Sequence, residues 1–136
     1  AYRMECNDKC AAIATDLGFY NQDIVDKLQK LDVLLLESNH DIHMLQVGSY
    51  PYPLKQRILG NRGHLSNESA GKLLCHLLHD DLKAVFLGHL SKENNYDELA
   101  FETVKLEIAF GSEKYQPDDF LIEVAKREEA SRMIEF

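Results

Sequence analysis

The sequence of 136 residues contains no tryptophan, only three prolines and only three cysteines. Its 45% hydrophobic and 28% charged residues, with few prolines and glycines, exclude a wholly disordered chain. Cys6, Cys10 and Cys75 form an odd set without C-x-x-C spacing, which is typical of free thiols in a reducing compartment. We therefore expect one globular domain in the cytoplasm.

Two further features are missing. No apolar run is long enough to span a bilayer, and the first residues lack a secretory pattern, so we expect no membrane partner. The chain also has no excess of positive charge: its formal net charge is −8, which excludes a protein that coats nucleic acid with its whole surface. One window, Gly48 to Asn67, nevertheless has no Asp or Glu and contains Lys55, Arg57 and Arg62, which predicts a local basic site.

Short apolar runs alternate with helical patterns along the chain, which predicts an α/β fold with a sheet of mixed direction. The run Val33–Leu36 has no polar alternation, which is typical of a strand covered on both faces. Asn21 and Ser66 are predicted helix caps, and Asn95 with Glu98 has the spacing of a capping box. The predicted strands are 2–6, 10–15, 33–36, the short apolar run in the stretch from Lys83 that stops at Gly88, and 120–125. The predicted helices follow Asn21, Asp41, Pro53, Ser66 and Asn95, and 126–136 is a possible loose tail.

Three of the apolar runs end at residues that carry chemistry. Asp16 follows the second run, Glu37 follows the third and His89 follows the fourth. Parallel strands that end together place their last side chains along one edge of a sheet, where α/β proteins keep their sites. Carboxylate and imidazole suit zinc and manganese, although an Asp after a strand is also an ordinary turn former.

Glu37 and His64 form a second candidate pair. A carboxylate at a buried strand end needs a partner, since isolated burial of its charge is costly. His64 stands just before the Ser66 cap and is a suitable partner. Such a pair can hold a proton donor near a leaving group, or it can be a purely structural hydrogen bond.

Several motifs, in order, resemble a known family. Ala14–Gly18 is similar to the TD-x-G motif of metallo-β-lactamase-fold hydrolases, and Phe86–Ser91 is similar to the last motif of that superfamily. The segments Leu36–Asp41, Pro51–Leu59, Arg62–Asn67 and Leu90–Asn95 resemble the bacterial YycJ (WalJ) type of this fold, which is regarded as nuclease-like.

The resemblance implies an αββα sandwich and a nuclease that acts on DNA through attack by metal-bound hydroxide. It implies that Asp16 bridges two divalent ions, zinc or manganese, and that His89 is a ligand of one. Glu37 and His64 are similar to the carboxylate–histidine pair that assists leaving-group protonation in the ribonuclease Z group.

One family motif is absent. The sequence has no H-x-H-x-D-H, which belongs to the N-terminal half of the sandwich, so residues 1–136 are expected to be a partial domain, the C-terminal half alone. The missing N-terminal half is then an expected partner, and the isolated chain is expected to bind metal poorly and to turn over slowly or not at all.

The acid-free window fits a phosphodiester substrate. Arg57 and Arg62 are predicted to bind phosphate in a fork, Lys55 is predicted to act as a point charge, and Tyr50 or Tyr52 to stack on a base. Further predicted substrate contacts are Lys92 and Asn94. Two other functions remain open from sequence: a hydrolase of small esters or thioesters with the same metal site, and a non-catalytic α/β module.

Overall fold

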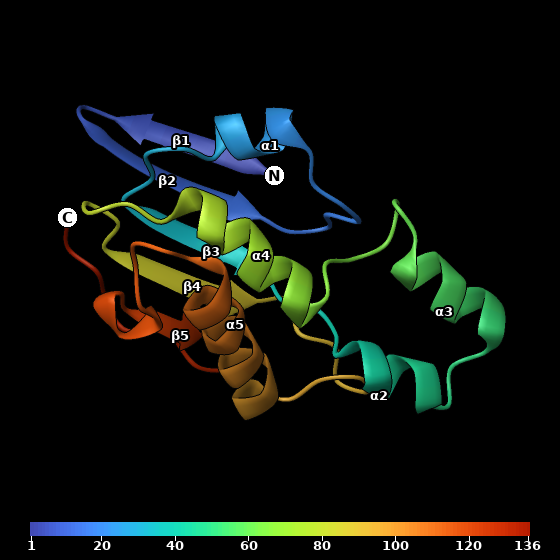
Figure 1. Cartoon of the computed structure of the whole chain (residues 1–136). Coiled ribbons are helices and arrows are strands. Elements are labelled where there is room, and N and C mark those ends of the chain that lie inside the picture. The colour runs from blue at the N-terminus through green and yellow to red at the C-terminus, as the bar shows by residue number, and fades with distance from the viewer.

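Five strands form one sheet in the order β1-β2-β3-β4-β5 in the computed structural model, which describes residues 1–136 (Figure 1). β1 is antiparallel to β2, and the other neighbouring pairs are parallel. The predicted α/β class with a mixed-direction sheet is therefore confirmed. The elements are β1 Tyr2–Cys6, β2 Lys9–Ala14, α1 Gln22–Lys27, β3 Val33–Glu37, α2 Ile42–Val47, α3 Tyr52–Leu59, α4 Asn67–Leu77, β4 Ala84–Gly88, α5 Asp97–Gly111, a 3₁₀ turn Pro117–Asp119 and β5 Ile122–Val124.

The register of the parallel strands aligns their carboxyl ends. Ala14 of β2 pairs with Leu36 of β3, Leu36 pairs with Leu87 of β4, and Leu87 pairs with Val124 of β5. Residues that follow these four positions therefore leave the sheet at the same edge. The predicted alignment of the strand ends is confirmed, and it includes a fourth strand, β5.

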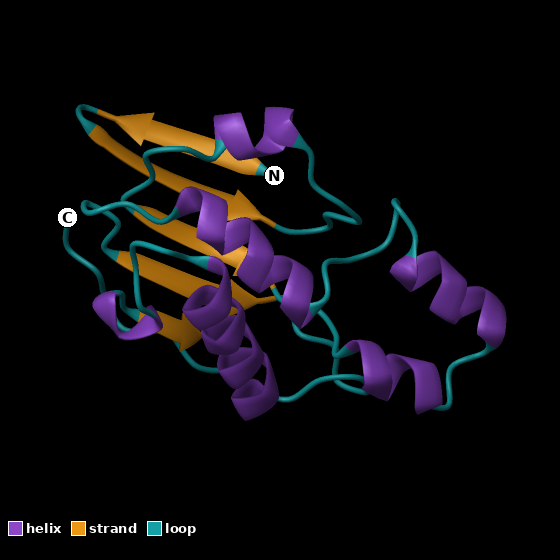
Figure 2. Ribbon diagram, viewed as in Figure 1, coloured by secondary structure: helices purple, strands orange, loops and turns teal.

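Helices α1, α4 and α5 all lie on one face of the sheet, whereas α2 and α3 extend beyond the edge at which the parallel strands end (Figures 1 and 2). α4 and α5 pack against each other, and their apolar side chains meet the alternate residues of the strands. Burial of such side chains stabilises the fold by about 1.5–3 kcal/mol each. The fully buried residues of this core include Leu34, Leu36, Val85, Leu87, Leu73, Leu74, Val104 and Ile108.

The opposite face of the sheet is only partly covered. Tyr2, Met4 and Ile13 are 77%, 50% and 39% exposed. Val33 and Leu35 are half-buried, so the prediction that their strand is covered on both faces is wrong. The reason is that the three helices packed on the sheet lie on a single side; only β4 is buried at all five positions.

Two of the three predicted caps are confirmed. Asn21 Oδ1 accepts a hydrogen bond from the backbone of Ile24 at 3.0 Å, and Ser66 Oγ accepts from Ser69 at 3.1 Å. The capping box at Asn95 is wrong, because the N-cap of α5 is Tyr96 and it has no side-chain cap bond. The amide of Asn95 is used elsewhere, in a buried network described below.

Residues 126–136 form no helix or strand. They are tied to the sheet edge, since Arg132 pairs with Glu123 of β5 at 2.5 Å. None of the helices of the chain combines the length and the apolar composition needed to cross a membrane.

Candidate active site

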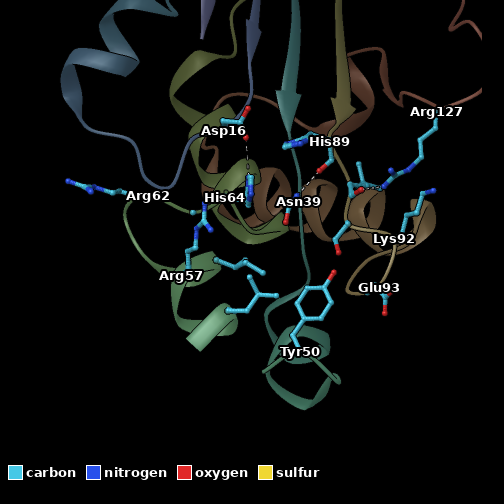
Figure 3. A pocket seen from close by; sticks show the side chains of 15 residues that line it. Asp16, Asn39, Tyr50, Arg57, Arg62, His64, His89, Lys92, Glu93 and Arg127 are labelled. Carbon is cyan, nitrogen blue, oxygen red and sulfur yellow. Dashed lines mark hydrogen bonds and ion pairs between the residues drawn. The ribbon is translucent and has the colours of Figure 1, made fainter. Parts of the chain in front are cut away.

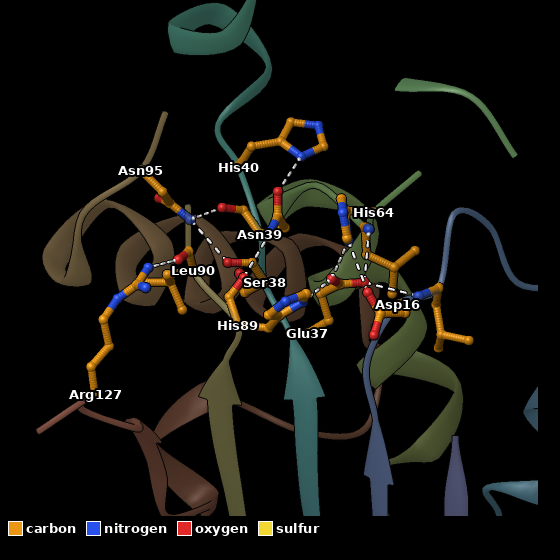
Figure 4. Close-up of polar contacts among 12 residues, drawn as sticks. Asp16, Glu37, Ser38, Asn39, His40, His64, His89, Leu90, Asn95 and Arg127 are labelled. Carbon is orange, nitrogen blue, oxygen red and sulfur yellow. Dashed lines mark hydrogen bonds and ion pairs between the residues drawn. The ribbon is translucent and has the colours of Figure 1, made fainter. Parts of the chain in front are cut away.

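Four side chains that the sequence singled out lie together at the edge where the parallel strands end. Asp16 follows β2, Glu37 ends β3, His89 follows β4, and His64 comes from the loop before α4. Each of the four has a metal-ligating atom within 4.8 Å of those of the other three (Figure 4). The predicted convergence of these residues is thus present in the structure.

Glu37 is the centre of this cluster. Its side chain is fully buried, and its Oε1 lies 2.8 Å from His64 Nδ1 and 2.6 Å from His89 Nδ1. Its Oε2 accepts hydrogen bonds from the backbone N–H of Leu17 at 3.0 Å and of Leu65 at 3.2 Å. Both oxygens therefore have partners, as a buried carboxylate requires. We predicted the contact with His64 but not the contact with His89.

The position of Glu37 determines how the two imidazoles can act. A carboxylate only accepts hydrogen bonds, so both Nδ1 atoms donate, and the Nε2 atom of each ring keeps its lone pair. Metal-ligating histidines usually donate their other N–H to such a carboxylate. The rings of His64 and His89 meet edge to face, with centroids 5.1 Å apart.

Asp16 completes a donor set that suits a divalent metal. Its Oδ1 lies 3.6 Å from His64 Nδ1, and its side chain is 73% exposed, so its carboxylate is accessible to an ion from solvent. One exposed carboxylate beside two imidazoles with free Nε2 atoms matches the ligand types of zinc and manganese. The chemistry of the residues present therefore fits the metal that the resemblance implies.

Both predicted metal ligands have unusual backbone conformations. Asp16 has φ 55° and His89 has φ 56°, in the left-handed region that residues other than glycine rarely adopt. Each such residue costs about 1–3 kcal/mol, which the surrounding contacts must offset. For His89, one of these contacts is the hydrogen bond from Asn39 Nδ2 to its carbonyl oxygen at 2.8 Å.

Two glycines allow the loops that carry Asp16 and His64 to pack closely. A Cβ on Gly18 would lie 2.2 Å from the carbonyl oxygen of Asn61, and one on Gly63 would lie 1.9 Å from that of Ile58. No larger residue fits either position without movement of the backbone. The end of α3 is thereby fixed next to the cluster.

A buried polar network lies behind the cluster and was not predicted from the sequence. The side-chain amides of Asn67 and Asn95 bond to each other at 3.0 and 2.8 Å. Asn95 Nδ2 also donates to the carbonyls of Ser38 and Asn39, at 2.9 and 3.1 Å. Ser38 Oγ donates to Asn67 at 2.7 Å. The network fixes the starts of α4 and α5 against the end of β3, which positions Glu37.

His40 belongs to the same buried region. Its side chain is almost completely buried, and its Nδ1 lies 3.3 Å from Asn39 Oδ1. Burial, together with the neighbouring His64, lowers the pKa of His40 to about 4, and the carboxylates of Glu37 and Asp41 oppose this only in part. His40 is therefore neutral at pH 7. The next residue, Asp41, caps α2, as the sequence suggested.

The cluster opens into a polar cavity (Figure 3). Three of the five predicted substrate contacts line it: Arg57, Arg62 and Lys92. Tyr50 lines it as well, and so does Arg127, which belongs to the segment that we predicted to be a loose tail. The lining contains four basic side chains and only two carboxylates, those of Asp16 and Glu93, on a chain whose net charge is −8.

The other two predicted substrate contacts do not line the cavity. Lys55 Nζ donates to the carbonyl oxygens of Gln46 and Gly48, at 2.7 and 2.6 Å, and so provides hydrogen-bond donors at the C-terminal end of α2. Asn94 is only 2% exposed, and its backbone carbonyl accepts from Asp41 at 2.9 Å. We therefore assign both residues to the support of the loops.

The sequence matches named proteins over most of its length. It is 42% identical over 108 residues to exodeoxyribonuclease WalJ of Streptococcus pneumoniae strains D39 and R6, a match that covers 79% of this chain and 40% of each relative. It is 36% identical over 99 residues to exodeoxyribonuclease YycJ of Bacillus anthracis, which covers 73% of this chain and 38% of that protein. No family model matches the sequence.

The chain thus spans about 40% of the length of these relatives. Its mixed sheet, with helices on one face, is consistent with part of an α/β sandwich. Over the matched part, the chain belongs to the WalJ/YycJ family of metallo-β-lactamase-fold proteins.

Proposed function

We propose that this chain is the C-terminal half of a metal-dependent phosphodiesterase that acts on DNA. The observation that carries the proposal is the meeting of Asp16, His64 and His89 around the buried Glu37, at the mouth of a cavity rich in basic side chains. The relatives' name, exodeoxyribonuclease, supports DNA as the substrate. A small ester would not need four basic side chains around the site.

Asp16 and His89 are the residues that would hold divalent ions, either zinc or manganese. Such ions lower the pKa of bound water to about 7 and neutralise charge on a phosphoryl group. Glu37 does not compete for the metal, because both of its oxygens already accept hydrogen bonds. It instead holds the His89 ring with the Nε2 atom free.

His64 is the proposed proton donor to the leaving oxygen. Its Nδ1–H stays on Glu37 at 2.8 Å, so the proton that is exchanged is the one on Nε2. The ring must carry a proton on both nitrogens before it gives up the one on Nε2, and the buried carboxylate holds the ring in place. Arg57, Arg62 and Lys92 would bind phosphate oxygens beside the scissile bond, and the Tyr50 ring would stack on a base.

The proposed partner of this chain is the rest of the sandwich. The exposed apolar side chains Tyr2, Met4 and Ile13 on the open face of the sheet would be covered by the second sheet. The remaining metal ligands would come from that half, since catalytic zinc usually has three protein ligands. A cytoplasmic location remains a prediction.

The proposal is tested by DNA degradation in a full-length relative such as the S. pneumoniae WalJ. Alanine at the position that aligns with Asp16 should abolish cleavage of end-labelled DNA at saturating manganese. Alanine at the positions that align with Arg57 and Arg62 should raise KM for DNA. If both arginine variants cleave DNA as the unaltered protein does, phosphodiester binding in this cavity is refuted.

A further inference from the structure

The fourth parallel strand, β5, ends at the same edge as the strands that supply the cluster. Asp16, Glu37 and His89 mark the ends of β2, β3 and β4. β5 continues this series, because Val124 pairs with Leu87 and the N–H of Ala125 donates to the carbonyl of Leu87 at 2.8 Å. The residues directly after β5 therefore lie at the same edge of the sheet as the residues that follow the other three strands.

Arg127 is the side chain that β5 delivers. It lines the same cavity as His64 and His89. One of its guanidinium nitrogens, Nη2, donates to the carbonyl oxygen of Leu90, the residue directly after His89 (Figure 4). This contact fixes the orientation of the guanidinium relative to the loop that carries His89, and it leaves the other N–H groups of the fork free.

The charge of Arg127 has no partner within the chain. The other two basic residues of the C-terminal segment are paired: Lys126 with Glu129 at 3.2 Å and Arg132 with Glu123 at 2.5 Å. Arg127 forms no ion pair with any carboxylate of the 136 residues, although Glu93 lines the same cavity. A preoriented guanidinium with an unpaired charge in a polar cavity is a suitable binding group for a phosphate.

The basic side chains of the cavity form two groups. Arg57 and Arg62 lie on the His64 side of the cluster, whereas Arg127 and Lys92 lie on the His89 side (Figure 3). When the reacting phosphate at the two histidines lies inside a strand, or next to an end that carries a terminal phosphate, further phosphates lie on both sides of it. Each group of basic residues then faces one direction of the strand.

We propose that Arg127 binds a backbone phosphate of the nucleic acid strand, on the side of the reacting phosphate opposite to that bound by Arg57 and Arg62. This inference rests on the proposed function, because it needs a phosphodiester in the cavity. It adds a subsite, so that the strand is held at both sides of the scissile bond.

The test compares Arg127→Gln with Arg132→Gln. Both variants remove one positive charge from the same segment, but Arg132 is paired with Glu123 and does not line the cavity. The probe is a fluorescently labelled short oligothymidylate, whose binding to the 136-residue chain is measured by anisotropy over a series of salt concentrations without metal. Each phosphate contact on a single strand contributes about 0.7 to the slope of log K against log salt.

We expect Arg127→Gln to lower the magnitude of this slope by about 0.7 and to weaken binding several-fold, and Arg132→Gln to change neither. Arg127→Lys should keep the slope, because its charge is retained, and lose part of the affinity, because the fork is lost. It also serves as the second variant if Arg127→Gln fails to fold.

Three results would overturn the inference. If Arg127→Gln and Arg132→Gln bind alike while Arg57→Gln binds more weakly, Arg127 is not a phosphate contact, but the proposed function stands. If all three bind as the unaltered chain does, binding lies outside this cavity. If the unaltered chain does not bind the oligonucleotide at all, this inference falls, whereas the proposed function is decided by the cleavage test in the full-length relative.

Discussion

The Oε1 atom of Glu37 lies 2.6 Å from the Nδ1 atom of His89, and the side chain of Glu37 has no solvent exposure. The same oxygen also accepts from His64, so one buried carboxylate orients both imidazoles of the cluster. Because β3 and β4 are neighbouring parallel strands, this contact follows from the register that pairs Glu37 with Gly88. The following predictions test what this arrangement does for stability and for binding.

Glu37→Gln should lower the free energy of unfolding by about 2–4 kcal/mol. Glutamine has one acceptor oxygen and one NH₂ group, so the NH₂ group would face either the two imidazole N–H donors or the two backbone N–H donors. Urea unfolding measures the difference. Glu113→Gln, at an exposed position, is the control and should change stability by less than about 0.5 kcal/mol. Equal stability of the two variants would mean that Glu37 does not hold these four donors.

Asp16→Gly should keep or raise stability by up to about 1 kcal/mol, because glycine adopts the left-handed conformation of this position without strain. The carboxylate that is lost is mostly exposed and makes only one contact, at 3.6 Å. Asp16→Ala should be less stable than Asp16→Gly, since alanine keeps the strain. The reverse order in urea unfolding would show that the backbone at residue 16 is not left-handed in solution.

The stability of the fold should fall as the pH drops below about 6.5. His40 has a folded-state pKa of about 4, below the ordinary value of 6.5, so between these values the unfolded chain binds more protons than the folded chain does. The stability that its neutral form contributes is complete above pH 6.5 and is lost as the pH falls toward 4, with a slope of at most about 1.4 kcal/mol per pH unit from this group.

Urea unfolding at several pH values between these limits measures this slope. Since the charges of Glu37, Asp41 and His64 all act on His40, the comparison must be made with a variant. His40→Gln should remove part of the slope, whereas His76→Gln, at an exposed position, should leave it unchanged. An unaltered slope in His40→Gln would show that His40 is not neutral and buried in the folded chain.

The 136-residue chain alone should bind zinc or manganese only weakly. Asp16 and His89 are the two proposed ligands on this chain, while catalytic zinc sites generally have three protein ligands. Isothermal titration calorimetry measures this affinity directly. Micromolar affinity that disappears in Asp16→Ala would contradict the prediction.

The local features of the chain could be predicted from its sequence, because their causes are local. The caps at Asn21 and Ser66 depend on a side chain and an N–H group a few residues away. The capping box at Asn95 failed because tertiary hydrogen bonds to Ser38 and Asn39 compete for the same amide. A rule based on spacing along the sequence cannot predict such competing tertiary hydrogen bonds.

The members of the cluster could be predicted from the sequence, but the geometry of their contacts could not. Asp16, Glu37, His64 and His89 were found from strand ends and motifs, yet the sharing of one Glu37 oxygen by two histidines depends on strand register. Arg127 was missed because β5 is short and the charged segment after it resembles a tail. Its place in the cavity lining becomes visible only when β5 pairs in parallel with β4.

The most direct test of the central claim, that Glu37 orients both imidazoles through Nδ1, is the tautomeric state of the two histidines. Long-range ¹H–¹⁵N correlation spectra of the metal-free protein, labelled at histidine and recorded above pH 7, distinguish the two ring nitrogens. We expect His64 and His89 each to carry the proton on Nδ1, with Nε2 unprotonated. A neutral ring that carries its proton on Nε2 and none on Nδ1, in either residue, would contradict the account, because that ring could not donate to Glu37.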